Sequence, residues 1–250
     1  MFRPYFSSFL AVPLLAVSLS SCICGDDDDN DHCAVSSEGP DVAETRAISD
    51  VTRLTISQNT EVYLTQGATP ELRLEAPRNV LDVLQTEVVG GELRIEAKKD
   101  INLKLKNPVR VYITLPNLTA LAGSGATHFH GATTWNVADL GLTLSGASTA
   151  ELALTATGTL RTEASGASRV TLRGTAGQQT AHLSGASALD AFDLTHLTAD
   201  IDASGASQTR LSVSSSLAVR ASGASEVFYQ GSPAITVQDI SGGSRLVKVN

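Results

Sequence analysis

A short repeat dominates the second half of this chain. The tetrapeptide Ser-Gly-Ala-Ser, or a close variant, begins at Ser124, Ser145, Ser165, Ser184, Ser204, Ser222 and Ser241, so successive copies start 21, 20, 19, 20, 18 and 19 residues apart. A period near twenty is too short for a propeller blade, and the repeats lack the leucine and asparagine spacing of leucine-rich repeats. It suits one rung of a β-solenoid, in which each turn of the chain stacks on the previous one.

The residues that follow each tetrad alternate in the manner of a strand with one buried face. Their fourth and sixth positions are mostly polar. Counted from the first serine, the fifth residue is Phe129, Ala150, Val170, Leu189, Thr209, Val227 or Leu246, and the seventh is Gly131, Leu152, Leu172, Ala191, Leu211, Tyr229 or Lys248. We therefore predict an all-β fold, a single-stranded parallel β-helix with rungs of about 20 residues, in which Val170 stacks on Ala150 and Leu189 on Val170. The coil is expected to be right-handed, because parallel crossovers nearly always are.

A coil must turn a corner at the same place on every rung, and this requirement explains the tetrad. Glycine adopts positive φ without a Cβ clash, the serines can bond to the backbone of the corner, and alanine is small enough to stack. The predicted turn glycines are Gly125, Gly146, Gly166, Gly185, Gly205, Gly223 and Gly242. The repeat is thus interpreted as structural rather than chemical.

Residues 48–120 also predict strands and no helix of useful length. Segments such as "EVYLTQG", "GELRIEA" and "VRVYITLP" alternate with period two and are separated by glycine and proline. We expect one β-solenoid domain over residues 48–250, with irregular rungs over 48–120 and tetrad rungs over 121–250. A separate small β-sandwich packed on the first rung is the alternative for residues 48–120.

The first residues are typical of an export signal. Arg3 begins a short charged region, and residues 6–19 are apolar but too few to span a bilayer comfortably. The sequence Leu19-Ser20-Ser21-Cys22 resembles the lipobox of bacterial lipoproteins, in which cleavage precedes a cysteine that receives a diacylglyceryl group. We expect residues 1–21 to be a lipoprotein signal peptide and Cys22 to carry the lipid, which anchors because each buried CH₂ contributes about 0.8 kcal/mol. An ordinary signal peptide cut nearby is the alternative.

Residues 22–47 are interpreted as a flexible acidic tether. The run "GDDDDND" over residues 25–31 carries like charges with no apolar partner, and it lacks the ligand pattern of a calcium loop. Cys24 and Cys33 flank this run, and they could form a small disulfide loop in an oxidising envelope compartment. The five aspartates of the run supply −5 of the net charge of −8. Nucleic acid is excluded as a partner because binding it requires a basic face.

From residue 48 onward the chain resembles the putative auto-transporter adhesin, head GIN domain family of bacterial envelope proteins. The segments that carry the resemblance are "VTRLTI", "VYLTQG", "LRLEAPRNVLD", "GELRIEA", "VRVYITLPNLTALAGSGA", the tetrad series and "EVFYQGSP". The family name implies a Gly-Ile-Asn signature, from which Asp100-Ile101-Asn102 departs. The resemblance implies an all-β stack in an exported or lipoprotein setting, and it implies no catalytic residues.

The common enzyme motifs are missing from this sequence. It contains no nucleophile elbow, phosphate loop, dinucleotide fingerprint or HExxH. His128, His130 and Glu151 are the nearest approach to a metal site, since two histidines flank a buried Phe129 and Glu151 should lie one rung on. We favour solvated surface histidines over a zinc or copper ion, and we expect no cofactor.

A second polar column lies two residues before each first serine. It reads Thr143, Glu163, His182, Asp202, Arg220 and Asp239. The alternation of sign indicates cross-rung charge pairs that stabilise the coil weakly. Polysaccharide lyases and hydrolases also use β-helices with acidic residues along one face, but they need clustered carboxylates, which His182 and Arg220 would separate here.

The sequence therefore favours a non-catalytic module of the cell envelope, a lipid-anchored adhesin or structural protein. We expect it in the outer membrane, on the surface or the periplasmic face. Glycans or other envelope proteins are the expected partners, and a homo-oligomer is possible. A carbohydrate-active enzyme on a β-helix scaffold is the alternative.

Overall fold

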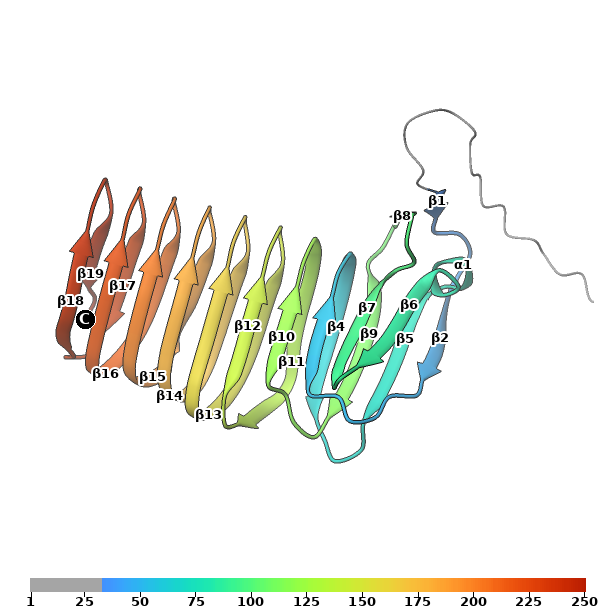
Figure 1. Cartoon of the computed structure of the whole chain (residues 1–250), viewed down its shortest axis with the longest axis horizontal. Coiled ribbons are helices and arrows are strands. Elements are labelled where there is room, and N and C mark those ends of the chain that lie inside the picture. Colours follow the sequence, from blue (N-terminus) through green and yellow to red (C-terminus); the bar gives the residue numbers. More distant parts are fainter. Residues whose placement is uncertain (1–32) are drawn as a thin grey trace, which may run out of the picture.

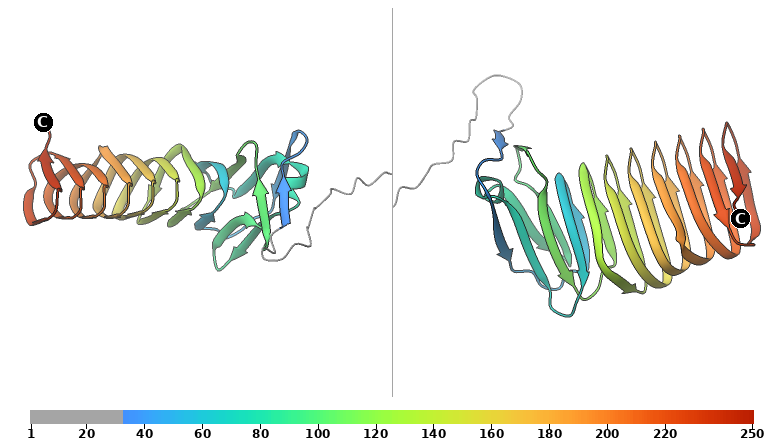
Figure 2. Two further views of the ribbon diagram at one scale, coloured as in Figure 1. Left: turned by 90° about the horizontal axis from the view of Figure 1, so that it is seen from above. Right: turned by 180° about the vertical axis from the view of Figure 1, so that it is seen from behind.

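The computed structural model describes residues 33–250, which form a β-solenoid of about six turns. This confirms the predicted fold class. The rungs lie side by side from an irregular N-terminal end to the C-terminal end (Figure 1), and the view from above shows the coil (Figure 2). The signal peptide, Cys22, Cys24 and the aspartate run lie outside the described residues.

Two sheets form the flat sides of the coil. Sheet 1 contains strands that follow the tetrads and the strands stacked on them: β9 (Val109–Leu115), β4 (Asn59–Gln66), β11 (Ala126–Val137), β17 (Glu226–Gln230) and β19 (Arg245–Lys248). Sheet 2 contains strands that precede the tetrads and the strands stacked on them: β7 (Glu92–Ala97), β3 (Arg53–Ile56), β10 (Ala120–Gly123), β12 (Leu140–Leu144) and β18 (Ala234–Ile240). Four long strands contribute to both sheets: β13 (Thr149–Ala164), β14 (Arg169–Leu183), β15 (Ala188–Ala203) and β16 (Gln208–Ala221).

The stacking register agrees with the register predicted from the tetrads. Ala150 pairs with Val170 and Val170 with Leu189, and all three side chains are buried. On sheet 2, Glu163 pairs with His182, and His182 with Asp202. The register is determined because a slip of one residue would turn every apolar side chain of a strand toward water.

Each tetrad forms the first corner of its rung. The seven predicted turn glycines have φ between +67° and +77°. The corners are also hydrogen-bonded to each other, as where the Ala167 backbone N–H donates to the Gly146 carbonyl at 2.8 Å. A Cβ on Gly166 would lie 2.7 Å from that same carbonyl oxygen, so both the backbone conformation and the close stacking require glycine. The second serine is buried, and the Ser168 hydroxyl donates to the Ser165 carbonyl at 2.7 Å.

One further corner of this kind was not predicted. Asn59 pairs with Ala126 and Thr60 with Thr127, so the segment 57–60 lies where the previous rung's tetrad would be. Gln58 holds the glycine position with φ of +85°. This corner has the sequence Ser-Gln-Asn-Thr, and because it lacks glycine it does not match the repeat.

The N-terminal end departs from a simple continuation of the coil. The rung of β3 and β4 lies between that of β7 and β9 and that of β10 and β11, so the rungs do not follow chain order. Three antiparallel strands extend the sheets beyond it: β2 (Asp41–Arg46), β5 (Glu71–Pro77) and β6 (Leu84–Val89). Strands β1 (Cys33–Ser36) and β8 (Ile101–Lys104) form a separate parallel pair.

A short helix covers the apolar interior at this end. Helix α1 (Arg78–Leu81) connects β5 to β6, and it brings Val80 and Leu81 into the core with exposed fractions of 0% and 1%. Solenoid ends need such a cap, because the last rung would otherwise expose its core to water. With four residues, α1 is far too short to cross a bilayer, and no other described helix offers a membrane span.

Candidate functional site

A row of aromatic side chains crosses the outer surface of sheet 1 near the cap. His130 stacks on Tyr63 with ring centroids 5.3 Å apart, and Tyr63 stacks on Tyr112 at 5.0 Å. The Arg73 guanidinium lies 4.2 Å from the Tyr112 ring centroid, a cation–π contact that closes the row. These four residues, which we call the aromatic row, come from β11, β4, β9 and β5 and are brought together by the out-of-order stacking of the rungs.

Ion pairs support the aromatic row on its N-terminal side. Arg110 contacts Asp41 at 2.9 Å and Glu75 at 3.2 Å, and the Tyr112 hydroxyl donates to Glu75 at 3.2 Å. Burial and the neighbouring Glu61 carboxylate raise the pKa of Tyr63 above its ordinary value. The phenol is therefore neutral at physiological pH and can act as a hydrogen-bond donor.

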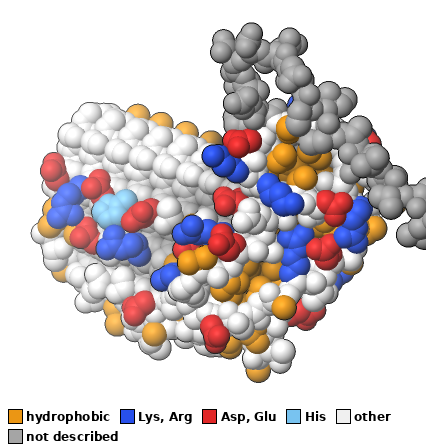
Figure 3. Space-filling view, turned by 45° about the vertical axis from the view of Figure 1, so that its right-hand side comes forward, with side chains coloured by type: hydrophobic (Ala, Val, Ile, Leu, Met, Phe, Trp, Pro, Cys, Tyr) orange, Lys and Arg blue, Asp and Glu red, His pale blue; other side chains and the backbone are white. Residues whose placement is uncertain are grey.

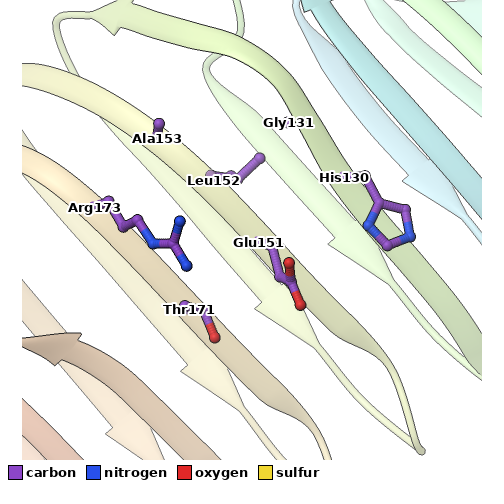
Figure 4. A pocket seen from close by; sticks show the side chains of 7 residues that line it. All are labelled: His130, Gly131, Glu151, Leu152, Ala153, Thr171 and Arg173. Carbon is purple, nitrogen blue, oxygen red and sulfur yellow. The ribbon is translucent and has the colours of Figure 1, made fainter. Parts of the chain in front are cut away.

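A shallow hollow of about 290 Å³ adjoins His130 on the other side (Figure 4). It forms where β11 bulges between His130 and Thr134 and breaks the register with β13. Gly131 and Ala153 have little or no side chain, so they leave space between their longer neighbours. The lining residues are His130, Gly131, Glu151, Leu152, Ala153, Thr171 and Arg173.

The polar groups of this hollow suit a neutral or acidic polar ligand. Glu151 can accept hydrogen bonds, Arg173 can donate up to five, and Thr171 can do both. Arg173 has only a loose contact with Asp193, at 3.8 Å, and its side chain is 67% exposed, so the guanidinium is accessible. Glu151 is the only carboxylate that lines the hollow, whereas glycoside hydrolysis requires two.

The histidines considered as metal ligands have other neighbours. His130 and Glu151 occupy paired positions, as predicted, but His130 belongs to the aromatic row, and Nδ1 of His128 lies 2.8 Å from the Thr149 hydroxyl. Within residues 33–250, no three His, Cys, Asp or Glu side chains lie close enough together to hold a metal ion.

The polar column of sheet 2 carries charges of both signs. His182 Nδ1 lies 3.9 Å from the Asp202 carboxylate, and Arg220 pairs with Asp200 at 2.9 Å. A second shallow hollow of about 280 Å³ includes Glu163 and His182. The space-filling view likewise shows acidic and basic side chains interspersed on one face of the molecule rather than separated by sign (Figure 3). Such exposed pairs contribute little to stability.

Several residues of the candidate site were not predicted from the sequence. Tyr63, Tyr112 and Arg73 lie in strands whose order in space differs from their order in the chain, and Arg173 lies two rungs from His130. Among the cysteines, Cys33 is disulfide-bonded.

The fold and its surface define a class of protein, a capped β-solenoid with one polar, aromatic-bearing side. The chain belongs to the family described as putative auto-transporter adhesin, head GIN domain, whose model matches residues 50–233. This confirms the resemblance seen in the sequence. Among curated proteins, none is significantly similar to the chain.

Solved structures of bacterial proteins share this fold. A putative adhesin from Bacteroides fragilis has a TM-score of 0.81 at 18% identity, covering 86% of this chain and 100% of that one. A putative lipid binding protein from Parabacteroides distasonis has a TM-score of 0.71 at 19% identity, covering 87% and 100%. A putative adhesin from Parabacteroides merdae has a TM-score of 0.69 at 13% identity, covering 87% and 99%.

Asp100, which stands where the Gly-Ile-Asn motif has glycine, lies at a backbone turn. Asp100 has φ of +62°, the left-handed region that glycine favours, and its carbonyl accepts a 2.8 Å hydrogen bond from the Cys33 N–H. Aspartate tolerates this region better than most residues. The backbone turn is therefore compatible with aspartate at the first position of the motif.

Proposed function

We propose that this protein is a non-catalytic adhesin of the cell envelope, anchored by a lipid on Cys22 and binding its partners through the exposed side of the solenoid. One observation carries the proposal: the two ends of the rod differ. Cys33, the first described residue, belongs to the capped end, and the last tetrad rung forms the other end (Figure 1). Cys33 lies only 11 positions after Cys22 in the chain. A lipid on Cys22 would hold the capped end near the membrane and display the rest of the rod.

The surface of sheet 1 supports binding rather than catalysis. The hollow beside the aromatic row offers a guanidinium, a carboxylate, a hydroxyl and an imidazole within one shallow, open area. Such groups suit the hydroxyls and carboxylates of a glycan, which we propose as the ligand class, with other envelope proteins as further partners. The family description supports an envelope or surface location. No observation favours the enzyme alternative.

Anchoring is tested by membrane fractionation of cells labelled with palmitate. Cys22→Ser should abolish labelling and release the protein, or leave an uncleaved precursor, because only this cysteine lies at the lipobox. The matched control is Cys24→Ser, which should remain labelled and attached. Equal labelling of the wild type and Cys22→Ser would refute the lipid anchor.

Binding is tested by screening the purified protein against a glycan array and a panel of acidic polysaccharides, with retention and chain cleavage both recorded. We expect retention without cleavage. Cleavage that Asp202→Ala abolishes would replace the adhesin with an enzyme, and retention of nothing would remove the glycan proposal.

A further inference from the structure

The last rung of the solenoid has two unpaired strand edges. Strand β18 pairs only with β16, and β19 only with β17, so neither has a neighbour on its outer side among the described residues. The Arg245 and Val249 N–H groups donate inward, to Ser225 and Tyr229. By the alternation of a parallel ladder, the N–H groups of Leu246 and Lys248 point toward the open edge. Such an edge is a template for another strand.

The interior of this rung is also open. Ile235, Ile240 and Leu246 stack on Leu217, Ala221 and Val227, which are at most 3% exposed. In contrast, Ile235 is 38% exposed, and Ile240 and Leu246 are only partly buried. The alternating buried pattern of β16 is absent from β18 and β19, because no further rung within residues 33–250 covers them.

The opposite end of the rod also has edge strands, since β2 pairs only with β5 and β6 only with β7 among the described residues, but its apolar interior is closed. Val80, Leu81 and Leu84 fill its interior with exposed fractions of at most 4%. The Arg46 guanidinium of β2 donates to the carbonyls of Leu81 in α1 and Leu84 in β6 at 2.9 and 2.8 Å, so it connects β2 to the helix and to β6. Head-to-tail stacking of one molecule on the next would therefore place an open end against a sealed one.

We infer that the open rung pairs with the open rung of a second copy, giving an end-to-end dimer. A partner must supply two strands and apolar side chains between them at once, which a single extended peptide cannot do and another solenoid end can. A two-fold axis would place β19 antiparallel to β19 of the second copy, with Leu246 opposite Leu246. The biological consequence of this dimer rests on the proposed function, because two molecules anchored by lipid at their capped ends would join two membranes.

The charges around the open rung permit this arrangement. Arg245 is paired with Glu226 in its own chain, and Asp239 lies beside Arg220 in the ladder. Lys248 is the only cation of β19 without an acidic partner among the described residues. Two copies would therefore meet without a concentration of like charge. The unpaired strand edges also fix how the strands of the two copies are oriented, which an apolar patch alone would not do.

Sedimentation equilibrium and small-angle X-ray scattering test the dimer on the whole chain carrying Cys22→Ser, so that no acyl chain contributes. We expect a concentration-dependent dimer with roughly twice the maximum dimension of the monomer. Ile235→Glu should weaken dimerisation by at least about tenfold, since it would bury two charges. The matched control is Val89→Glu, the same kind of change at a 51% exposed site on the capped end, which should leave the dimer intact.

A second variant addresses strand pairing without adding charge. Lys248→Pro removes an N–H that faces the open edge, so it should weaken the dimer while retaining monomer stability. A monomer at every concentration, a dimer no longer than the monomer, or dimerisation of Ile235→Glu equal to wild type would overturn the inference. Glycan retention by a strictly monomeric protein would leave the proposed function standing, whereas a dimer that retains no glycan would uphold the self-pairing alone.

Discussion

Replacing one corner glycine should destabilise the whole solenoid, and Gly166→Ala is the most informative case. The left-handed conformation of Gly166, with φ of +70°, costs a residue with a Cβ about 1–2 kcal/mol. The new methyl would also lie 2.7 Å from the Gly146 carbonyl oxygen, and such overpacking typically costs about 1–3 kcal/mol because the backbone must move. Reduced freedom of the unfolded chain offsets about 0.4–1 kcal/mol of this. We expect a net loss of about 1–5 kcal/mol in the free energy of unfolding.

Urea unfolding followed by far-UV circular dichroism measures this loss. The matched control is Gly141→Ala in β12, where φ is not in the left-handed region and the nearest atom to a new Cβ is 3.8 Å away. That variant should change the free energy of unfolding by less than about 1 kcal/mol. A Gly166→Ala protein as stable as Gly141→Ala would refute the claim that the tetrad glycines are required by the stacked corner.

Two further substitutions test single features of the fold. Gln58→Gly should raise the free energy of unfolding by about 0.5–1 kcal/mol in urea titrations, because relief of the left-handed strain exceeds the entropic cost of glycine; an unchanged or lower stability would contradict the strain. Burial lowers the pKa of His196, opposed by the hydrogen bond of its Nδ1 to the Ser212 carbonyl. Since the unfolded state then binds the proton more readily, stability from this site is fully present above about pH 6.5 and is lost as pH falls toward and through the folded pKa. Unfolding titrations between about pH 5 and 7 should show this loss in the wild type and a smaller one in His196→Leu, and identical slopes would show that His196 is not responsible.

The regular part of the fold was predictable because each tetrad marks the same corner. Once Gly146, Gly166 and Gly185 are aligned, the pairing of Ala150 with Val170 and of Glu163 with His182 follows from counting. A substitution within the tetrad prevents that rung from being aligned with the others. Gln58 does so, and its corner was therefore missed although its backbone conformation is close to that of Gly125.

The cap and the aromatic row could not be obtained in the same way. Alternation with period two identifies β5 and β7 as strands but does not distinguish parallel from antiparallel partners. Tyr63 and Tyr112 are neighbours only because β9 lies beside β4 rather than beside β10. The hollow depends on a bulge after His130, and Gly131 is the only residue whose type indicates this bulge in the sequence.

We propose that this protein binds its ligand through the outer side of sheet 1, and the most direct test compares three variants on a glycan retained in the screen. Arg173→Ala and Glu151→Gln remove the charged groups of the hollow, whereas Arg161→Ala removes another exposed arginine, from sheet 2, where it pairs with Glu163 at 3.6 Å. Titration calorimetry should give dissociation constants at least about tenfold weaker for the first two variants and unchanged for the third. Equal affinities for all three proteins would contradict the claim.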